Sequence, residues 1–248
     1  MNLTEEQIKR GFWYYDPRRE FPPECVTRLD EHKGGERLNI ACTQLPVHAS
    51  EQRAIVKQWC EALPNLTAVR YLWFSSRVSQ EMFEAVSRMS ALEGLYIKWS
   101  GIKTMASITS LTNLKAFHLG TSGSLENIDA LSKMSDLLIL ELENLKKIRK
   151  LDPIATLTQL QGLKVEGSME TTQVVDTLAP LSQLTGLRYL FLANLKTRDK
   201  TLRPLTSLRA LETLHTAWWY PDEEFRMLRD ALPNLKHGNP VERRSDGI

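Results

Sequence analysis

Apolar residues recur along this chain at spacings of three, three and two positions, which match no single regular element. In LTNLKAFHL (111–119) the apolar positions are Leu111, Leu114, Phe117 and Leu119. An amphipathic helix requires spacings of three and four, and a half-buried strand requires strict alternation. The pattern therefore predicts a turn, which carries the first two positions, followed by a short strand, which carries the last two.

The same pattern occurs seven times at a nearly constant period. The other six copies are LTAVRYLWF (66–74), MSALEGLYI (89–97), MSDLLILEL (134–142), LTQLQGLKV (157–165), LTGLRYLFL (184–192) and LRALETLHT (208–216). The third apolar positions of all seven copies are Leu72, Leu95, Phe117, Leu140, Leu163, Leu190 and Leu214. Successive positions are separated by 23, 22, 23, 23, 27 and 24 residues. This period predicts a repeat array, in which no repeat hides its apolar edge without its neighbours.

The repeat resembles that of the leucine-rich-repeat family, whose pattern is L-x-x-L-x-x-L-x-L, over residues 37–238. Its length of 22–24 residues is similar to the internalin-like and phosphatase-regulatory classes. The resemblance implies an α/β solenoid, a right-handed horseshoe with a parallel concave β-sheet and with helices on the convex side, mainly near the ends. In the family, asparagine is common five positions after the third apolar residue. This chain departs from that pattern, because those positions hold Ser100, Ser122, Leu145, Ser168, Leu195 and Trp219.

Three segments near the ends of the array have the apolar spacing of helices. They are residues 50–66, with Ser50 as the N-terminal cap, residues 79–89, and residues 221–235, with Asp222 as the cap. Terminal repeats must shield the open ends of a stack, so we expect these helices to close the array.

The predicted organisation has three parts. Residues 1–36 form an N-terminal cap, residues 37–238 form the leucine-rich-repeat domain with seven clear repeats and degenerate ends, and residues 239–248 form a flexible tail. The aromatic residues at 12–15 either plug the first repeat or are exposed. Packing is favoured, because four adjacent exposed aromatic side chains would promote aggregation.

The register of the repeats predicts which side chains point out of the sheet. The two apolar residues of L-x-L face the core, so the residues between and beside them face outward. The candidate partner-binding residues lie in three columns: Trp73, Tyr96, His118, Glu141, Lys164, Phe191 and His215 in the central one, Tyr71 and Tyr189 before it, and Lys98, Glu143 and Glu166 after it.

Aromatic residues lie at both ends of these columns and charged residues lie between them. Exposed aromatic side chains on a rigid sheet are typical of a protein-binding hot spot, although some could pack within the protein instead. His118, Glu141 and Lys164 would be lateral neighbours and could form a base, an orienting carboxylate and a cation. A ladder of neutralising surface charges is the favoured interpretation of these three, because an open sheet implies no pocket.

Composition and charge narrow the classes of partner. The net charge is only +2, and the basic residues are spread along the chain rather than clustered. Neither nucleic acid nor a membrane is therefore predicted as a partner. The first residues, MNLTEEQIKR, lack the apolar core of a secretory signal, and no later run is long enough to span a bilayer, which favours a cytoplasmic protein. Three widely spaced cysteines, Cys25, Cys42 and Cys60, indicate reduced thiols rather than a disulfide or zinc framework.

The sequence thus predicts a non-catalytic protein-protein interaction module, monomeric when unbound, that needs no cofactor or metal and holds another protein on its concave face. Two alternatives stay open. One is a bacterial toxin-neutralising immunity protein, and the other is an effector or adaptor that regulates a cellular enzyme. The fold itself does not choose among them, because repeat scaffolds host many targets.

Overall fold

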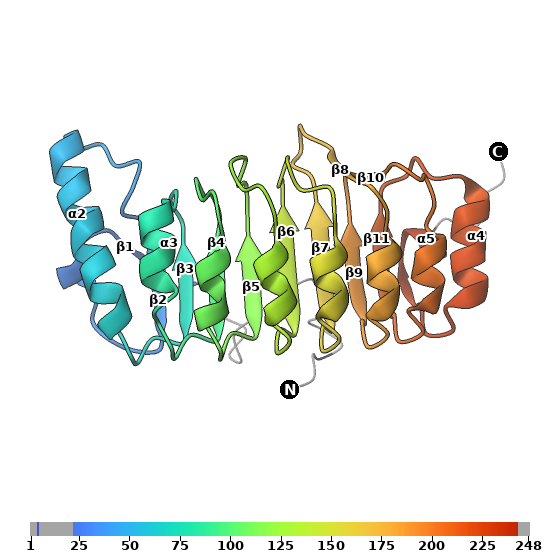
Figure 1. Cartoon of the computed structure of the whole chain (residues 1–248), viewed down its shortest axis with the longest axis horizontal. Helices are drawn as coiled ribbons and strands as arrows, with labels where there is room; N and C mark the ends of the chain where they lie inside the picture. The colour runs from blue at the N-terminus through green and yellow to red at the C-terminus, as the bar shows by residue number, and fades with distance from the viewer. Residues whose placement is uncertain (1–3, 5–21, 243–248) are drawn as a thin grey trace.

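The computed structural model describes residue 4 and residues 22–242 of the chain (Figure 1). The aromatic residues at 12–15 and the end of the predicted tail at 243–248 lie outside the described residues. Each predicted repeat supplies one short strand, and the strands stack side by side along the molecule (Figure 1).

The main sheet has ten strands, and all of its pairings are parallel. In spatial order these are β1 (Cys25–Val26), β2 (Arg37–Ile40), β3 (Tyr71–Phe74), β4 (Gly94–Ile97), β5 (Ala116–Leu119), β6 (Ile139–Glu143), β7 (Gly162–Glu166), β9 (Tyr189–Leu192), β11 (Thr213–Thr216) and β12 (His237–Gly238). Strand β1 lies within the predicted cap, so the sheet begins before residue 37. A second, two-stranded parallel sheet pairs β8 (Gln173–Val175) with β10 (Leu195–Thr197).

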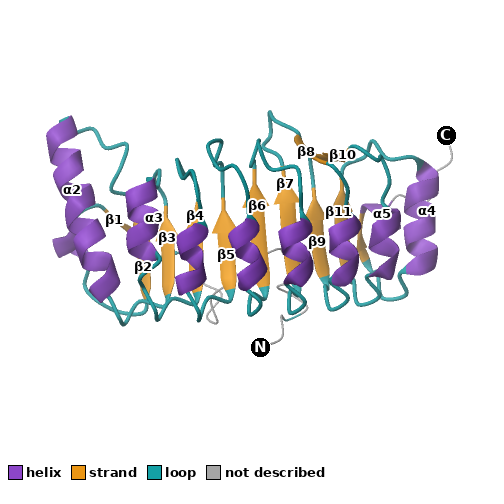
Figure 2. Ribbon diagram, viewed as in Figure 1, coloured by secondary structure: helices purple, strands orange, loops and turns teal. Residues whose placement is uncertain are grey.

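Helical segments line one face of the main sheet (Figure 2), and we call the opposite face the open face. The α-helices lie near the ends of the array: α2 (Ala49–Ala62), α3 (Gln80–Val86), α4 (Asp222–Ala231) and α5 (Asn239–Glu242). Single 3₁₀ turns replace them in the other repeats: η3 (Ala106–Ser110), η4 (Asp129–Lys133), η5 (Asp152–Thr156), η6 (Ala179–Gln183) and η7 (Arg203–Ser207). Two more, η1 (Leu29–Glu31) and η2 (Leu63–Asn65), lie at the N-terminal end, and η2 directly follows α2. Repeats this short leave room for only one tight turn between strands.

Two predicted helix caps differ from the structure. Helix α2 begins one residue before Ser50, and its cap is His48, whose ring Nδ1 accepts a hydrogen bond from the Ser50 backbone N–H. Helix α4 begins at Asp222, which is therefore its first residue, while the extended Pro221 precedes it. Three acidic residues in the first turn of α4 still complement its dipole.

The predicted start of the tail at residue 239 is too early. Residues 239–242 form α5, and the side chain of Asn239 is buried. Its Oδ1 accepts a hydrogen bond from the backbone N–H of Thr216 on β11, which ties this short helix to the end of the sheet. The packed domain therefore extends through α5.

The core is a continuous stack of the repeated apolar residues. Leu111, Leu114, Phe117 and Leu119 are each at most 1% exposed, and the equivalent residues of the other repeats join the same cluster. The longest repeat step, from Leu163 to Leu190, preserves the register, because Leu163 pairs with Leu190. Its additional residues lie between β7 and β9 and include β8.

Asparagine supports the sheet edge one position before the place where the family pattern has it. Asn144 and Asn194 immediately precede Leu145 and Leu195, and both have a positive φ, of 53° and 48°. The side-chain amide of Asn194 donates hydrogen bonds to the carbonyl oxygens of Ser168 and Thr171. The middle repeats therefore keep part of the side-chain hydrogen bonding to the backbone that asparagine provides in the family pattern.

Candidate protein-binding face

The strand pairing places the predicted central column in a single row across the open face. Each residue pairs with the next across neighbouring strands, in the order Trp73, Tyr96, His118, Glu141, Lys164, Phe191 and His215. Tyr71 and Tyr189 lie in the preceding column and Glu143 and Glu166 pair in the following one, as the repeat register predicts. Parallel strands about 4.8 Å apart bring these side chains into lateral contact.

Much of this column is more buried than a fully exposed recognition surface. Tyr71, Trp73, His118, Glu141 and Tyr189 each expose 8% or less of their surface. Tyr96, Glu143, Lys164, Glu166, Phe191 and His215 are half-buried. Lys98 was predicted on the same face, but it is exposed and lies just beyond the end of β4. The sequence left open whether the aromatic residues are exposed or pack within the protein, and Tyr71, Trp73 and Tyr189 are packed. Large side chains on adjacent strands contact one another, which a register alone does not reveal.

A polar cluster lies at the centre of the open face. The Nδ1 atom of His118 is 2.6 Å from Oε2 of Glu141, and its Nε2 is 3.9 Å from Oε2 of Glu143. The ring of Tyr96 stacks on the imidazole, with ring centroids 4.1 Å apart and planes 15° apart. Burial, with the two nearby carboxylates, raises the pKa of Tyr96 to about 12, so its phenol stays protonated at neutral pH.

Lys164 continues the row next to Glu141. Its Nζ lies 2.6 Å from Oε1 of Glu166. Burial alone would lower the pKa of Lys164, but the nearby carboxylates of Glu141 and Glu166 outweigh it and raise this pKa. Burial raises the pKa of Glu166 despite its ion pair with Lys164. The lysine is thus firmly cationic and held among three glutamates.

The C-terminal side of the open face is an aromatic cluster. The rings of Tyr189 and Phe191 are parallel, with centroids 6.4 Å apart, and the imidazole of His215 lies 5.5 Å from the Phe191 ring. The ammonium of Lys164 lies over the other side of this cluster, 5.2 Å from the Phe191 centroid. Charged and aromatic parts of the predicted site are therefore contiguous.

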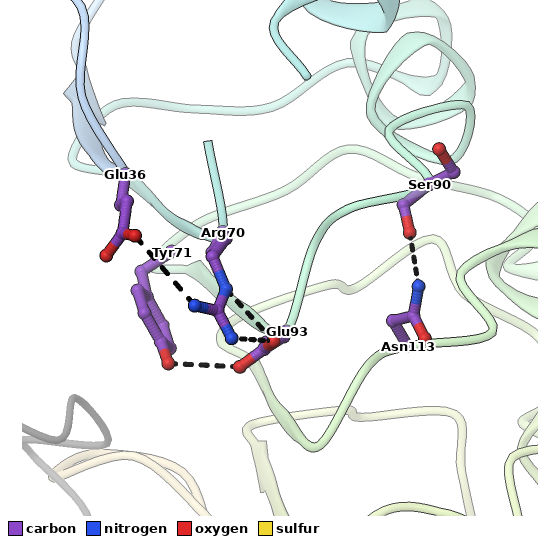
Figure 3. A network of polar contacts seen from close by, with 6 residues as sticks. All are labelled: Glu36, Arg70, Tyr71, Ser90, Glu93 and Asn113. Atoms are coloured by element: carbon purple, nitrogen blue, oxygen red, sulfur yellow. Dashed lines mark hydrogen bonds and ion pairs between the residues drawn. The ribbon is translucent and has the colours of Figure 1, made fainter. Parts of the chain in front are cut away.

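The N-terminal side is held by an acidic and basic network (Figure 3). The hydroxyl of Tyr71 donates to Oε2 of Glu93 at 3.0 Å, and the guanidinium of Arg70 binds the other oxygen of the same carboxylate. Glu36 approaches Arg70 from the preceding repeat at 3.8 Å. This network fixes the Tyr71 ring against the sheet.

Next to Tyr71 the open face is hollowed. Small residues at Gly94 and Ala116 line a shallow hollow of about 40 Å³. The other residues around it include Tyr71, Trp73, Tyr96, His118, Ile139 and Glu141. The sequence contains the signal for it, because the preceding column alternates large residues with glycine and alanine.

His118, Glu141 and Lys164 lie side by side as the sequence predicts, but the cation, Lys164, forms its close ion pair with Glu166. His118 and Glu141 form a close pair. Within residue 4 and residues 22–242, no group of three His, Cys, Asp or Glu side chains is placed to hold a metal ion. Cys25, Cys42 and Cys60 are free thiols, and burial raises the pKa of Cys42 to about 12.

No protein-family model and no curated protein sequence matches this chain. Solved structures do match it. Internalin C2 of Listeria monocytogenes aligns with a TM-score of 0.56 at 23% identity, over 72% of this chain and 74% of that one. An internalin, InlF, of the same organism aligns with a TM-score of 0.52 at 21% identity, over 71% of this chain and 62% of that one.

The chain has the leucine-rich-repeat fold. Parallel strands at the predicted period, 3₁₀ turns on one face and the match to the internalins together establish this α/β solenoid. A structure of the Drosophila Toll–Spätzle complex also matches, with a TM-score of 0.53 at 16% identity, over 72% of this chain and 23% of that one. The chain thus spans about three quarters of internalin C2 and a smaller part of the other two.

None of the helices in the described part of this chain has the length and apolar character needed to cross a bilayer.

Proposed function

We propose that this chain is a non-catalytic protein-binding module that holds its partner on the open face of its sheet. The observation that carries the proposal is the contiguous row of Lys164, Phe191 and His215, which is only half-buried and combines an aromatic anchor with a fixed cation. Aromatic residues supported by packed neighbours dominate the energy of protein interfaces.

The central cluster would add specificity. Nε2 of His118 is buried and has no hydrogen-bond partner among the described residues. A partner group that reaches this nitrogen would satisfy it, whereas a partner without such a group would leave it unpaired. Glu143 and Glu166, beside Lys164, favour a partner surface with positive charge near this point.

Two finer versions of this function, which the sequence left open, are compatible with the proposal. A bacterial toxin-neutralising immunity protein would use the open face against one toxin, and an effector or adaptor would use it against a cellular enzyme. Toll was solved in complex with Spätzle, which illustrates protein binding by another chain of this fold. A cytoplasmic location and a monomeric unbound state belong to the same proposal.

Affinity capture from the native cell tests the proposal. The wild-type chain is compared with a Phe191→Ala/His215→Ala variant and with a Lys133→Ala variant, whose exposed side chain lies on η4, on the other face of the sheet. We expect mass spectrometry to identify a protein retained by the wild-type and Lys133→Ala chains and lost from the double variant. Equal retention by all three, with folding confirmed by circular dichroism, would reject the open face as the binding site.

A further inference from the structure

The most exposed apolar side chains of this protein lie away from the open face. Within residue 4 and residues 22–242, the exposed large hydrophobic residues are Val47, Trp99, Met169, Trp218 and Trp219. Each of them lies in a segment that follows a strand of the parallel sheet. Since the strands are parallel, these segments share one edge, which is the upper edge in Figure 1 and which we call the rim.

Tryptophan and lysine are paired at two places on the rim. The ammonium of Lys98 lies 4.3 Å from the ring centroid of Trp99, after β4, and that of Lys196 lies 4.6 Å from the ring of Trp219, after β11. Stacking on an indole fixes the position of a lysine that would otherwise sample many rotamers. Each pair therefore presents an ordered positive charge beside exposed apolar surface.

The second pair lies in a groove of about 380 Å³. Its lining is Lys196, Thr197, Lys200, Trp219, Tyr220 and Pro221, which includes two lysines and no acidic residue. Arg198 nearby is paired with Asp176 at 3.2 Å, so these two charges offset each other. Asp199 is the acidic residue next to Lys200 in sequence, and it does not line the groove.

The small second sheet builds one wall of this groove. Strand β10, which contains Lys196, pairs with β8 in the small second sheet, next to the top of β7 in Figure 1. The loop before β8 folds around Asn194, which binds the carbonyl oxygens of Ser168 and Thr171 and accepts from the hydroxyl of Thr172. This loop holds Met169 fully exposed.

Gly167 permits the loop, since a Cβ there would lie 2.0 Å from the carbonyl oxygen of Thr171. These hydrogen bonds tie the backbone around Met169, while its fully exposed side chain is flexible and can adapt to an apolar group of a partner.

We propose that the rim is a second docking surface, which binds an extended acidic segment of a partner protein that carries an apolar anchor. The anchor packs against Trp219 in the groove, and the flanking carboxylates bind the ammonium groups of Lys196 and Lys200. The Trp99 and Lys98 pair lies five strand spacings away, at about 4.8 Å each, so a longer acidic segment reaches both. The open face has three glutamates at its centre and cannot serve an acidic segment in this way.

A phage-displayed random peptide library, selected against the full chain, tests this inference without knowledge of the natural partner. Peptides from the selection are synthesised and their affinities measured for the wild-type chain and for Trp219→Ala, Lys196→Glu/Lys200→Glu, and Phe191→Ala. A charge-matched control, Lys133→Glu/Arg203→Glu, changes two exposed residues of η4 and η7 on the helical face. Thermal unfolding confirms that each variant is folded.

We expect the selected peptides to combine Asp or Glu with an aromatic or aliphatic residue. Their affinity should fall at least tenfold in Trp219→Ala and in the lysine double variant, should weaken with added salt, and should stay unchanged in the control and in Phe191→Ala. Selection of no such peptides, or of peptides that depend on Phe191 and not on Trp219, would overturn the inference. Binding of the wild-type chain to phosphatidylserine vesicles that is lost in Trp219→Ala would instead identify the rim as a membrane contact and would also overturn it.

The Phe191→Ala arm separates this inference from the proposed function. Loss of the natural partner in Phe191→Ala, with peptide binding retained, would support both surfaces. Peptide binding through Trp219 would support the rim even if the open face bound nothing.

Discussion

At the residue scale, the central polar pair of the open face illustrates how much a buried contact depends on both partners. His118 and Glu141 are each 7% exposed and are 2.6 Å apart. Glu141→Leu should lower the free energy of unfolding by about 1–3 kcal/mol, because it leaves the buried imidazole without its partner. Urea denaturation checks this against Glu126→Leu, where the lost partner is the exposed Lys147 at 3.8 Å, and where we expect less than about 0.5 kcal/mol. Similar losses in the two variants would show that the central pair is no stronger than a surface contact.

A second residue-scale prediction concerns pH. Burial beside Phe191 lowers the pKa of His215 below its ordinary value of 6.5. The unfolded chain therefore binds a proton at this residue at a higher pH than the folded chain, so the stability associated with neutral His215 is lost as pH falls through and below 6.5. His215→Phe removes this loss. As the pH falls from about 7.5 to about 5.5, the free energy of unfolding of the variant should therefore decrease less than that of the wild type. A difference that stays constant over this range would contradict the assignment.

At the element scale, close packing of adjacent strands limits what the turn after β5 accepts. A Cβ at Gly120 would lie 2.2 Å from the carbonyl oxygen of Lys98, whereas nothing lies within 4 Å of a Cβ at Gly123. Gly120→Ala should therefore lower the unfolding free energy by about 1–3 kcal/mol, since the edge of β4 must shift. Gly123→Ala serves as the control in chemical denaturation and should change it by less than about 0.5 kcal/mol. Equal effects of the two alanines would mean that the strands are not packed as closely as described.

The strands and their register could be predicted from the sequence, because L-x-L fixes which residues face the core and neighbouring repeats align those positions. The columns from Trp73 to His215 follow directly from this rule. Burial within a column could not be predicted, since it depends on how Tyr96 stacks on His118 and how Phe191 lies between Lys164 and His215. The cap of α2 was missed because a histidine side chain, rather than the serine that follows it, accepts the hydrogen bond. The two-stranded sheet of β8 and β10 was not predicted, because the additional residues of the longest repeat have no periodic apolar pattern.

At the scale of the whole molecule, the solenoid separates two surfaces of different character. The open face carries a half-buried aromatic and ionic row with three glutamates around one lysine, and the rim carries exposed tryptophans with lysines stacked upon them. A partner that uses the open face is thus expected to differ in charge from a segment that uses the rim.

The affinity of the captured partner for single variants tests the central claim most directly. Isothermal titration calorimetry would compare the wild-type chain with Phe191→Ala and with Lys133→Ala, which removes an exposed side chain of η4. The account predicts at least a tenfold rise in Kd for Phe191→Ala, about 1.4 kcal/mol, and no change for Lys133→Ala. An unchanged Kd for a correctly folded Phe191→Ala chain would contradict binding on the open face.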